Sequence, residues 1–157
     1  MPTYTSTPSS FPAGSIITDV KLANWELLLD AISEAWTPYT PALTNLSVGN
    51  GSMTAKYIQA GKLVVCTGKI VLGSTSTVTG TIGIGIPVTA ADTIAVGSAL
   101  LYDSSTVATR SGGECDLAST TSLEFFGGNG GGPASATLPF TWTTGDQLRW
   151  EILYEAA

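Results

Sequence analysis

The side chains that could do chemistry in this 157-residue sequence are mainly carboxylates, because the chain contains no histidine. The lack of histidine removes the commonest general base near neutral pH and the commonest metal ligand. It also excludes Ser-His-Asp, Cys-His and HExxH sites. A pair of carboxylates could still hydrolyse glycosides, and the candidates are Asp92, Asp103, Glu114, Asp116 and Glu124. Their spacing singles out no pair, so we expect solvated acidic side chains and predict no enzyme, no catalytic residue and no cofactor.

Two further patterns approach known ligand sites without meeting their requirements. Glu114 and Asp116, together with Asp103, offer oxygen atoms for calcium, but their spacing is not that of an EF-hand. The glycine-rich run 127–133 lacks the lysine of a GxxxxGK[ST] loop and leads to a proline instead of a helix. We therefore predict no metal site here, and we expect 127–133 to be a flexible or interface loop.

Aromatic side chains beside polar ones could form a carbohydrate-binding surface. The candidates are Tyr102, Phe125, Phe126 and Trp142. Aromatic residues of β-sandwiches more often alternate into the core, and we expect that for each of the four. Recognition of a host-surface glycan remains the alternative function.

Composition restricts the partners of the chain. Its net charge is −6, and its six cations, Lys21, Lys56, Lys62, Lys69, Arg110 and Arg149, form no run, so we expect no nucleic-acid partner. No stretch reaches the roughly 18 apolar residues of a membrane span, and the N-terminus lacks the features of a signal peptide. We therefore expect no membrane partner and assembly in the cytosol. Charged residues make up only 11% of the chain, which suits either subunit packing or an ordinary threonine-rich β protein.

Turn residues divide most of the chain into short β segments. Asn50-Gly51 favours a type I′ turn, which predicts a hairpin of 43–48 with 53–59. Gly61-Lys62 then separates the second of these strands from a third at 63–72. In that third strand Val64, Cys66, Ile70 and Leu72 share one face with Gly68.

The rest of the sequence continues the β pattern. Alternation predicts strands at 80–86, 93–103, 106–110, 115–118 and 122–126, and a final strand with Leu148, Trp150, Ile152 and Tyr154 on one face. About eight or nine strands with short connections indicate a mainly β fold, an antiparallel jelly-roll-like β-sandwich. Cys66 belongs to an apolar face, and Cys115 follows two glycines in a polar context. We expect two reduced thiols.

The first 36 residues have a different pattern. Residues 1–16, rich in proline, predict an extended attachment arm with Tyr4 and Phe11 as its apolar anchors. Thr18 or Asp19 can cap a helix within 17–36. The helix carries an apolar seam at spacings of 3, 4, 3 and 4, made of Leu22, Trp25, Leu29, Ile32 and Trp36. This seam suits a parallel bundle around a threefold axis, although a helix lying on its own β domain would show nearly the same stripe.

Several short motifs along residues 36–157 occur together. They are Trp36-Thr37-x-Tyr39-Thr40-Pro41-x-Leu43-Thr44-Asn45, Gly49-Asn50-Gly51, Tyr57, Gly61-Lys62, Leu72-Gly73-Ser74, Ile86-Pro87, Phe140-Thr141-Trp142, Gly145-Asp146-x-Leu148 and Tyr154-Glu155. In this order they resemble a domain found in small virion proteins of tailed bacteriophages. The resemblance implies a non-enzymatic homotrimer with a β-sandwich or jelly-roll fold, located on the capsid as decoration or fibres, or on the tail.

These expectations combine into one hypothesis. Residues 1–16 form an attachment arm, 17–36 a trimerisation or docking helix, and 37–157 a β-sandwich knob. The resemblance favours a homotrimeric capsid decoration or head-fibre protein of the virion, assembled in the host cytoplasm and bound to the major capsid protein or a tail protein. The alternative is a minor tail or tail-fibre tip protein that binds host-surface carbohydrate.

Overall fold

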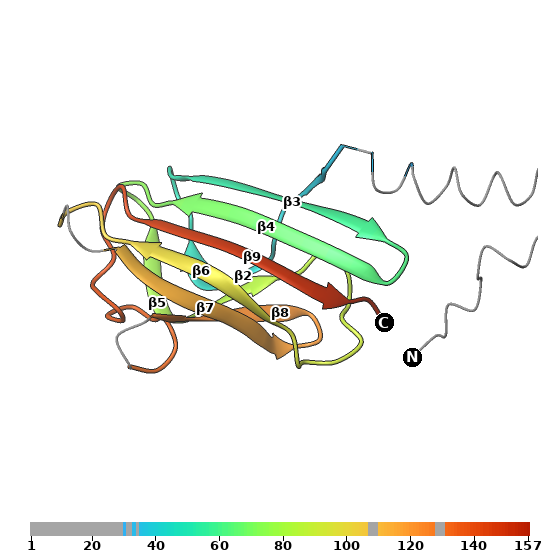
Figure 1. Ribbon diagram of the computed structural model, residues 1–157. Helices are drawn as coiled ribbons and strands as arrows, with labels where there is room; N and C mark the ends of the chain where they lie inside the picture. Colours follow the sequence, from blue (N-terminus) through green and yellow to red (C-terminus); the bar gives the residue numbers. More distant parts are fainter. Residues whose placement is uncertain (1–29, 31–32, 34, 107–109, 128–130) are drawn as a thin grey trace, which may run out of the picture.

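The computed structural model describes residues 30, 33, 35–106, 110–127 and 131–157. The strands of this part are β1 (Thr37–Tyr39), β2 (Leu43–Ser47), β3 (Ser52–Ala60), β4 (Leu63–Val71), β5 (Thr77–Gly85), β6 (Val96–Tyr102), β7 (Arg110–Ser119), β8 (Ser122–Gly127) and β9 (Gln147–Glu155). They form one curled antiparallel sheet in the order β1-β3-β4-β9-β6-β7-β8-β5-β2 (Figure 1). The mainly β, antiparallel prediction is confirmed, whereas the jelly-roll-like sandwich stays a prediction. The arm and all of the helix seam except Trp36 lie outside the described residues.

The β3–β4 hairpin forms where the sequence predicts it. Ala60 and Leu63 are paired, and the two-residue turn between them begins with Gly61 at a φ of +61°. Residues with a Cβ rarely adopt this left-handed backbone conformation, which explains why the position is glycine. The hairpin continues along both strands to the pair of Ser52 with Val71.

The predicted hairpin between residues 43–48 and 53–59 is wrong, because β2 pairs with β5 and not with β3. A turn does follow β2, but the predicted type I′ turn at Asn50-Gly51 is wrong: the Gly51 amide donates to the Val48 carbonyl at 2.8 Å, and the positive φ, +54°, belongs to Gly49. The Asn50 side chain, however, binds another loop. Its Oδ1 accepts a hydrogen bond from the Thr75 amide at 2.9 Å. After this turn the chain enters β3, which lies next to β1 at the opposite edge of the sheet from β2.

One face of the sheet forms the core. On β9, Leu148, Trp150, Ile152 and Tyr154 are buried as predicted. On β4, Val64, Cys66 and Ile70 are fully buried, also as predicted. Strands far apart in sequence meet in this core: the rings of Phe125 and Trp150 contact edge to face with centroids 6.1 Å apart.

Both cysteines belong to this core and both are free thiols. The polar surroundings expected for Cys115 are wrong, because its side chain is fully buried on the inner face of β7. Burial raises the pKa of the Cys115 thiol to about 12, and burial also raises the pKa of Cys66. Cys66 lies 3.0 Å from the hydroxyl of Tyr39, which closes the β1 edge of the core.

Asp146 is a fully buried carboxylate that joins three segments. Its Oδ1 accepts hydrogen bonds from the amide and hydroxyl of Ser104 at 2.8 and 2.9 Å. Its Oδ2 accepts from the amide and hydroxyl of Thr143 at 2.6 and 3.2 Å. Its own carbonyl accepts from the Leu72 amide at 2.9 Å. These hydrogen bonds replace the hydrogen bonds to water that the carboxylate loses when it is buried.

Candidate functional site

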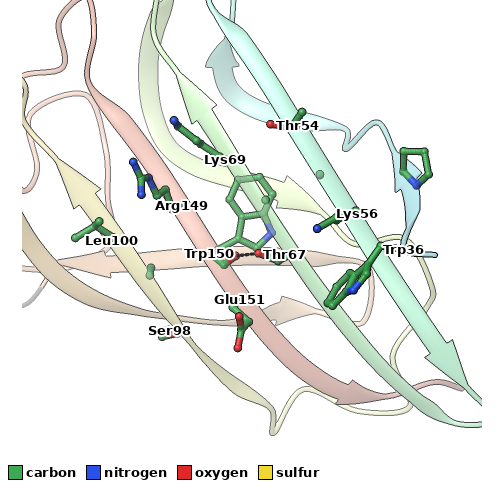
Figure 2. Close-up of a pocket in the computed structure, with 14 residues that line it drawn as sticks. Trp36, Thr54, Lys56, Thr67, Lys69, Ser98, Leu100, Arg149, Trp150 and Glu151 are labelled. Atoms are coloured by element: carbon green, nitrogen blue, oxygen red, sulfur yellow. Dashed lines mark hydrogen bonds between the residues drawn. The ribbon is translucent and has the colours of Figure 1, made fainter. Parts of the chain in front are cut away.

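A groove lies on the outer face of the sheet, opposite the core, and we call it the outer groove. It extends over β3, β4, β9 and β6, with Trp36 and Pro38 at the β1 side, and has a volume of about 620 Å³ (Figure 2). Its polar lining follows from β alternation, since Thr54, Lys69 and Arg149 point away from the buried neighbours on their strands. The outer groove is therefore a feature of the sheet surface and not of the core.

Three of the six cations of this acidic chain line the outer groove: Lys56, Lys69 and Arg149. Lys69 and Arg149 are direct cross-strand partners on β4 and β9, and Figure 2 shows their side chains next to each other. Like charges directly opposite each other destabilise a sheet. We therefore expect the Lys69–Arg149 pair to lower the stability of the isolated chain.

The cations of the groove are oriented by neighbours that do not neutralise them. Gln147 Oε1 accepts from Arg149 Nη2 at 2.6 Å and from Nε at 3.1 Å. The Lys56 ammonium lies over the Trp36 ring, 5.0 Å from its centroid. Within the described ranges the one ion pair is the exposed Lys62–Glu155 contact at 3.5 Å, outside the groove. The described residues thus provide no carboxylate within ion-pair distance of the groove cations.

Hydroxyl groups and one carboxylate complete the polar lining. Thr54, Thr67 and Ser98 carry hydroxyls, and Glu151 lies on β9 directly opposite Thr67. The Thr67 hydroxyl donates to the Trp150 carbonyl at 3.0 Å, which fixes its rotamer. The groove consequently offers positive charge, hydrogen-bond donors and one acidic acceptor within a single surface.

An apolar row borders the outer groove on the same face. Ile58 on β3 is paired with Val65 on β4, which is paired with Leu153 on β9. Val96 continues the row on β6. Leu153 is 56% exposed and Val96 63% exposed. We call these four residues the apolar row. Exposed apolar surface spanning several strands is typical of interaction sites.

The seam residue Trp36 lies at the wall of the groove and is 37% exposed. Of the four aromatic candidates for glycan binding, Phe125 is in the core, as expected. Tyr102, Phe126 and Trp142 are half-buried. The Trp142 ring packs on Phe140, and its Nε1 donates to the Ser135 carbonyl at 2.8 Å. None of the four lines the outer groove, which uses Trp36 instead.

The five candidate carboxylates separate into two groups. Asp92 and Asp103 hold local turns by accepting from the amides of Ile94 and Ser105. Glu114, Asp116 and Glu124 lie together across β7 and β8, where Asp116 and Glu124 are paired. Burial, with a contribution from the charge of Glu114, raises the pKa of Asp116. Among the residues that the structure describes, no group of three or more potential ligands could hold a metal ion. In the same part of the chain, no helix is long and apolar enough to span a membrane.

Little in the sequence indicates the outer groove. Lys56, Lys69 and Arg149 are scattered along the chain and form no run. The alternation of buried and exposed residues in β3, β4 and β9 does indicate, however, that each of these cations lies on the face opposite the core.

Comparison with protein-family models, curated proteins and solved structures finds no significant match to this chain. Function is therefore inferred from the geometry of the outer face and from the motif resemblance.

Proposed function

We propose that this protein is a structural component of a bacteriophage virion, a homotrimeric capsid decoration or head-fibre protein. In this proposal the arm and helix at 1–36 bind the shell and trimerise, and residues 37–157 form a jelly-roll-like sandwich knob. The virion assignment is carried by the motif resemblance, and several residues of these motifs also have defined structural roles in the fold. Asn50 binds the loop at Thr75, Gly61 makes the β3–β4 turn, and Asp146 joins three segments.

The assembly part of the proposal is carried by the apolar row. A single chain leaves Leu153 and Val96 more than half exposed on the sheet surface, and Trp36, which is 37% exposed, lies at the β1 side of the same face. Burial of such side chains contributes roughly 25 cal/mol per Å² of apolar surface. Further copies of this chain are the proposed cover, because Trp36, the last residue of the predicted seam, also lines the groove on this face.

The deciding experiment is the copy number of the chain in purified particles, measured by quantitative mass spectrometry against the major shell protein. A number comparable with that of the shell protein is expected for a decoration protein. Absence from the particle would overturn the virion proposal.

A second candidate is favoured by the outer groove: a minor tail or tail-fibre tip protein that binds host-surface carbohydrate. Sugar-binding sites combine aromatic and polar groups in a shallow depression, and the groove contains both. A copy number of a few per particle would favour this candidate over capsid decoration.

A further inference from the structure

We propose that the outer groove is the binding site for an acidic saccharide, with Lys69 and Arg149 holding a sugar carboxylate. The inference deepens the carbohydrate-binding candidate. It does not depend on the location of the protein in a virion. Binding by the isolated protein and copy number per particle are separate measurements, so the two proposals can fail separately.

The first argument is the unfavourable arrangement of charge. Lys69 and Arg149 are directly opposite each other in the β4–β9 register, although the whole chain has a net charge of −6. The chain contains 12 acidic residues that could form ion pairs with these two cations. No described carboxylate, however, lies within 4.0 Å of either one. Local features that cost stability without a structural benefit concentrate at functional sites. An anion between the two side chains would remove their repulsion.

The second argument is the pre-orientation of Arg149. Gln147 Oε1 accepts two hydrogen bonds from its guanidinium, through Nε and Nη2. The guanidinium fork is therefore held in one orientation and keeps further N–H donors for a ligand. Arginine recognises a carboxylate through paired hydrogen bonds, which makes a held guanidinium a better receptor than a mobile one.

The third argument is that the rest of the groove suits a sugar ring. The hydroxyls of Thr54 and Ser98 and the carboxylate of Glu151 can exchange hydrogen bonds with sugar hydroxyls. Trp36 provides an apolar wall at the β1 side (Figure 2). The volume of about 620 Å³ lies within the range of roughly 300–1,000 Å³ typical of small-molecule sites.

The observations favour an acidic saccharide over a nucleic acid. Within the part of the chain that the structure describes, only three cations line the groove, and Glu151 lies among them. The net charge of −6 would repel a long polyphosphate beyond the groove. A short saccharide that carries a carboxylate places its negative charge locally and leaves its hydroxyls for Glu151.

The test is isothermal titration calorimetry of the full chain with two carboxylated sugars, tetragalacturonate and sialyllactose. Their neutral counterparts, the methyl ester of tetragalacturonate and lactose, are the matched ligands. We expect at least one acidic sugar to bind, its neutral counterpart to bind at least about tenfold more weakly, and the affinity to fall with added salt. Lack of binding by both acidic sugars would overturn the proposal.

Variants locate the binding to the groove. Lys69→Met and Arg149→Gln should each weaken binding about tenfold or more, because each removes a charged hydrogen-bond partner. Lys62→Met is the matched control, since Lys62 is an exposed lysine outside the groove. All three positions carry surface side chains, and circular dichroism will show whether each variant is folded. Equal effects of Lys62→Met and Lys69→Met would contradict the assignment.

Titrations with two competing anions test whether the groove prefers an acidic saccharide to other anions. Inorganic phosphate and a single-stranded oligothymidylate are titrated at the ionic strength used for the sugars. Binding of either one to the groove as tight as that of the acidic sugar would replace the saccharide proposal by a phosphate site or a nucleic-acid site. Much weaker binding of both supports it.

Discussion

The indole of Trp150 lies directly over the backbone of Gly68, its partner across the β4–β9 pair. A Cβ at residue 68 would overlap the six-membered ring of the indole. The glycine thus makes room for the large aromatic side chain that packs against Phe125 in the core. The same two residues also line the outer groove, so the packing of the core and the shape of the groove both depend on this contact.

Gly68→Ala should lower the free energy of unfolding by about 1–3 kcal/mol, because the added methyl group displaces the indole in a packed core. Gly112→Ala on β7 is the matched control, since a Cβ there meets no atom within 4 Å. Its effect should remain within roughly 1 kcal/mol in either direction. Urea denaturation followed by tryptophan fluorescence measures both. Equal effects of the two substitutions would show that the indole does not fill this space.

Asp146→Ala should destabilise the protein by about 3 kcal/mol, because it leaves four donors of Ser104 and Thr143 without their acceptor. Asp146→Asn should cost less but still destabilise, since one of its two acceptors becomes a donor. Asp92→Asn is the control, because Asp92 is exposed and makes one local bond. Thermal melting temperatures compare the three. An unchanged melting temperature for Asp146→Ala would contradict the role of this carboxylate.

Cys66 and Cys115 should resist alkylation in the folded protein. At about pH 8 a free thiol is partly ionised, but burial raises the pKa of Cys115 to about 12 and keeps it protonated. Iodoacetamide followed by mass spectrometry should therefore add no group to the native protein and two groups in concentrated urea. Rapid labelling of the native protein would show that the core opens on the timescale of the reaction.

Asp116 should make the protein less stable as the pH rises from 3.8 through its raised folded-state pKa. The pKa of its carboxyl is higher in the folded state, chiefly because of burial, so the folded state binds more protons in this window. Asp116→Asn should remove this loss and stabilise the protein at neutral pH by less than about 1 kcal/mol, because the neutral amide is easier to bury and is not repelled by Glu114, while solvent screens this partly exposed position.

The contrast is Asp103, whose pKa is lowered mainly by its hydrogen bond with Ser105. Its contribution has the opposite sign: it is present above pH 3.8 and is lost as the pH falls through the lowered pKa. Unfolding free energies measured across this pH range for the wild type, Asp116→Asn and Asp103→Asn will separate the two. A loss of stability in Asp116→Asn at neutral pH would contradict the assigned sign.

Leu153→Asp should convert the proposed trimer to monomers if the apolar row is covered by further copies. The monomer fold should survive, because Leu153 is more than half exposed. Thr81→Asp on β5 is the control at another exposed strand position. Mass is measured by light scattering coupled to size exclusion.

Leu29→Asp tests the helix seam in the same way. Monomers would place the seam between subunits, whereas an unchanged mass with a lower melting temperature would place it on the β domain of its own chain. If the wild type itself is monomeric, the trimer proposal is wrong.

The sequence alone determined the local features of this fold. Period-2 alternation in β9 assigned its buried face, and Gly61 marked the β3–β4 turn, because both depend on neighbouring residues only. It also excluded histidine-based chemistry. Only the tertiary structure decided that β2 pairs with β5, since turn residues after a strand do not determine which strand it pairs with. The same reason applies to the outer groove. Lys69 and Arg149 become neighbours solely through the β4–β9 register, which is fixed by burying the inner faces of distant strands.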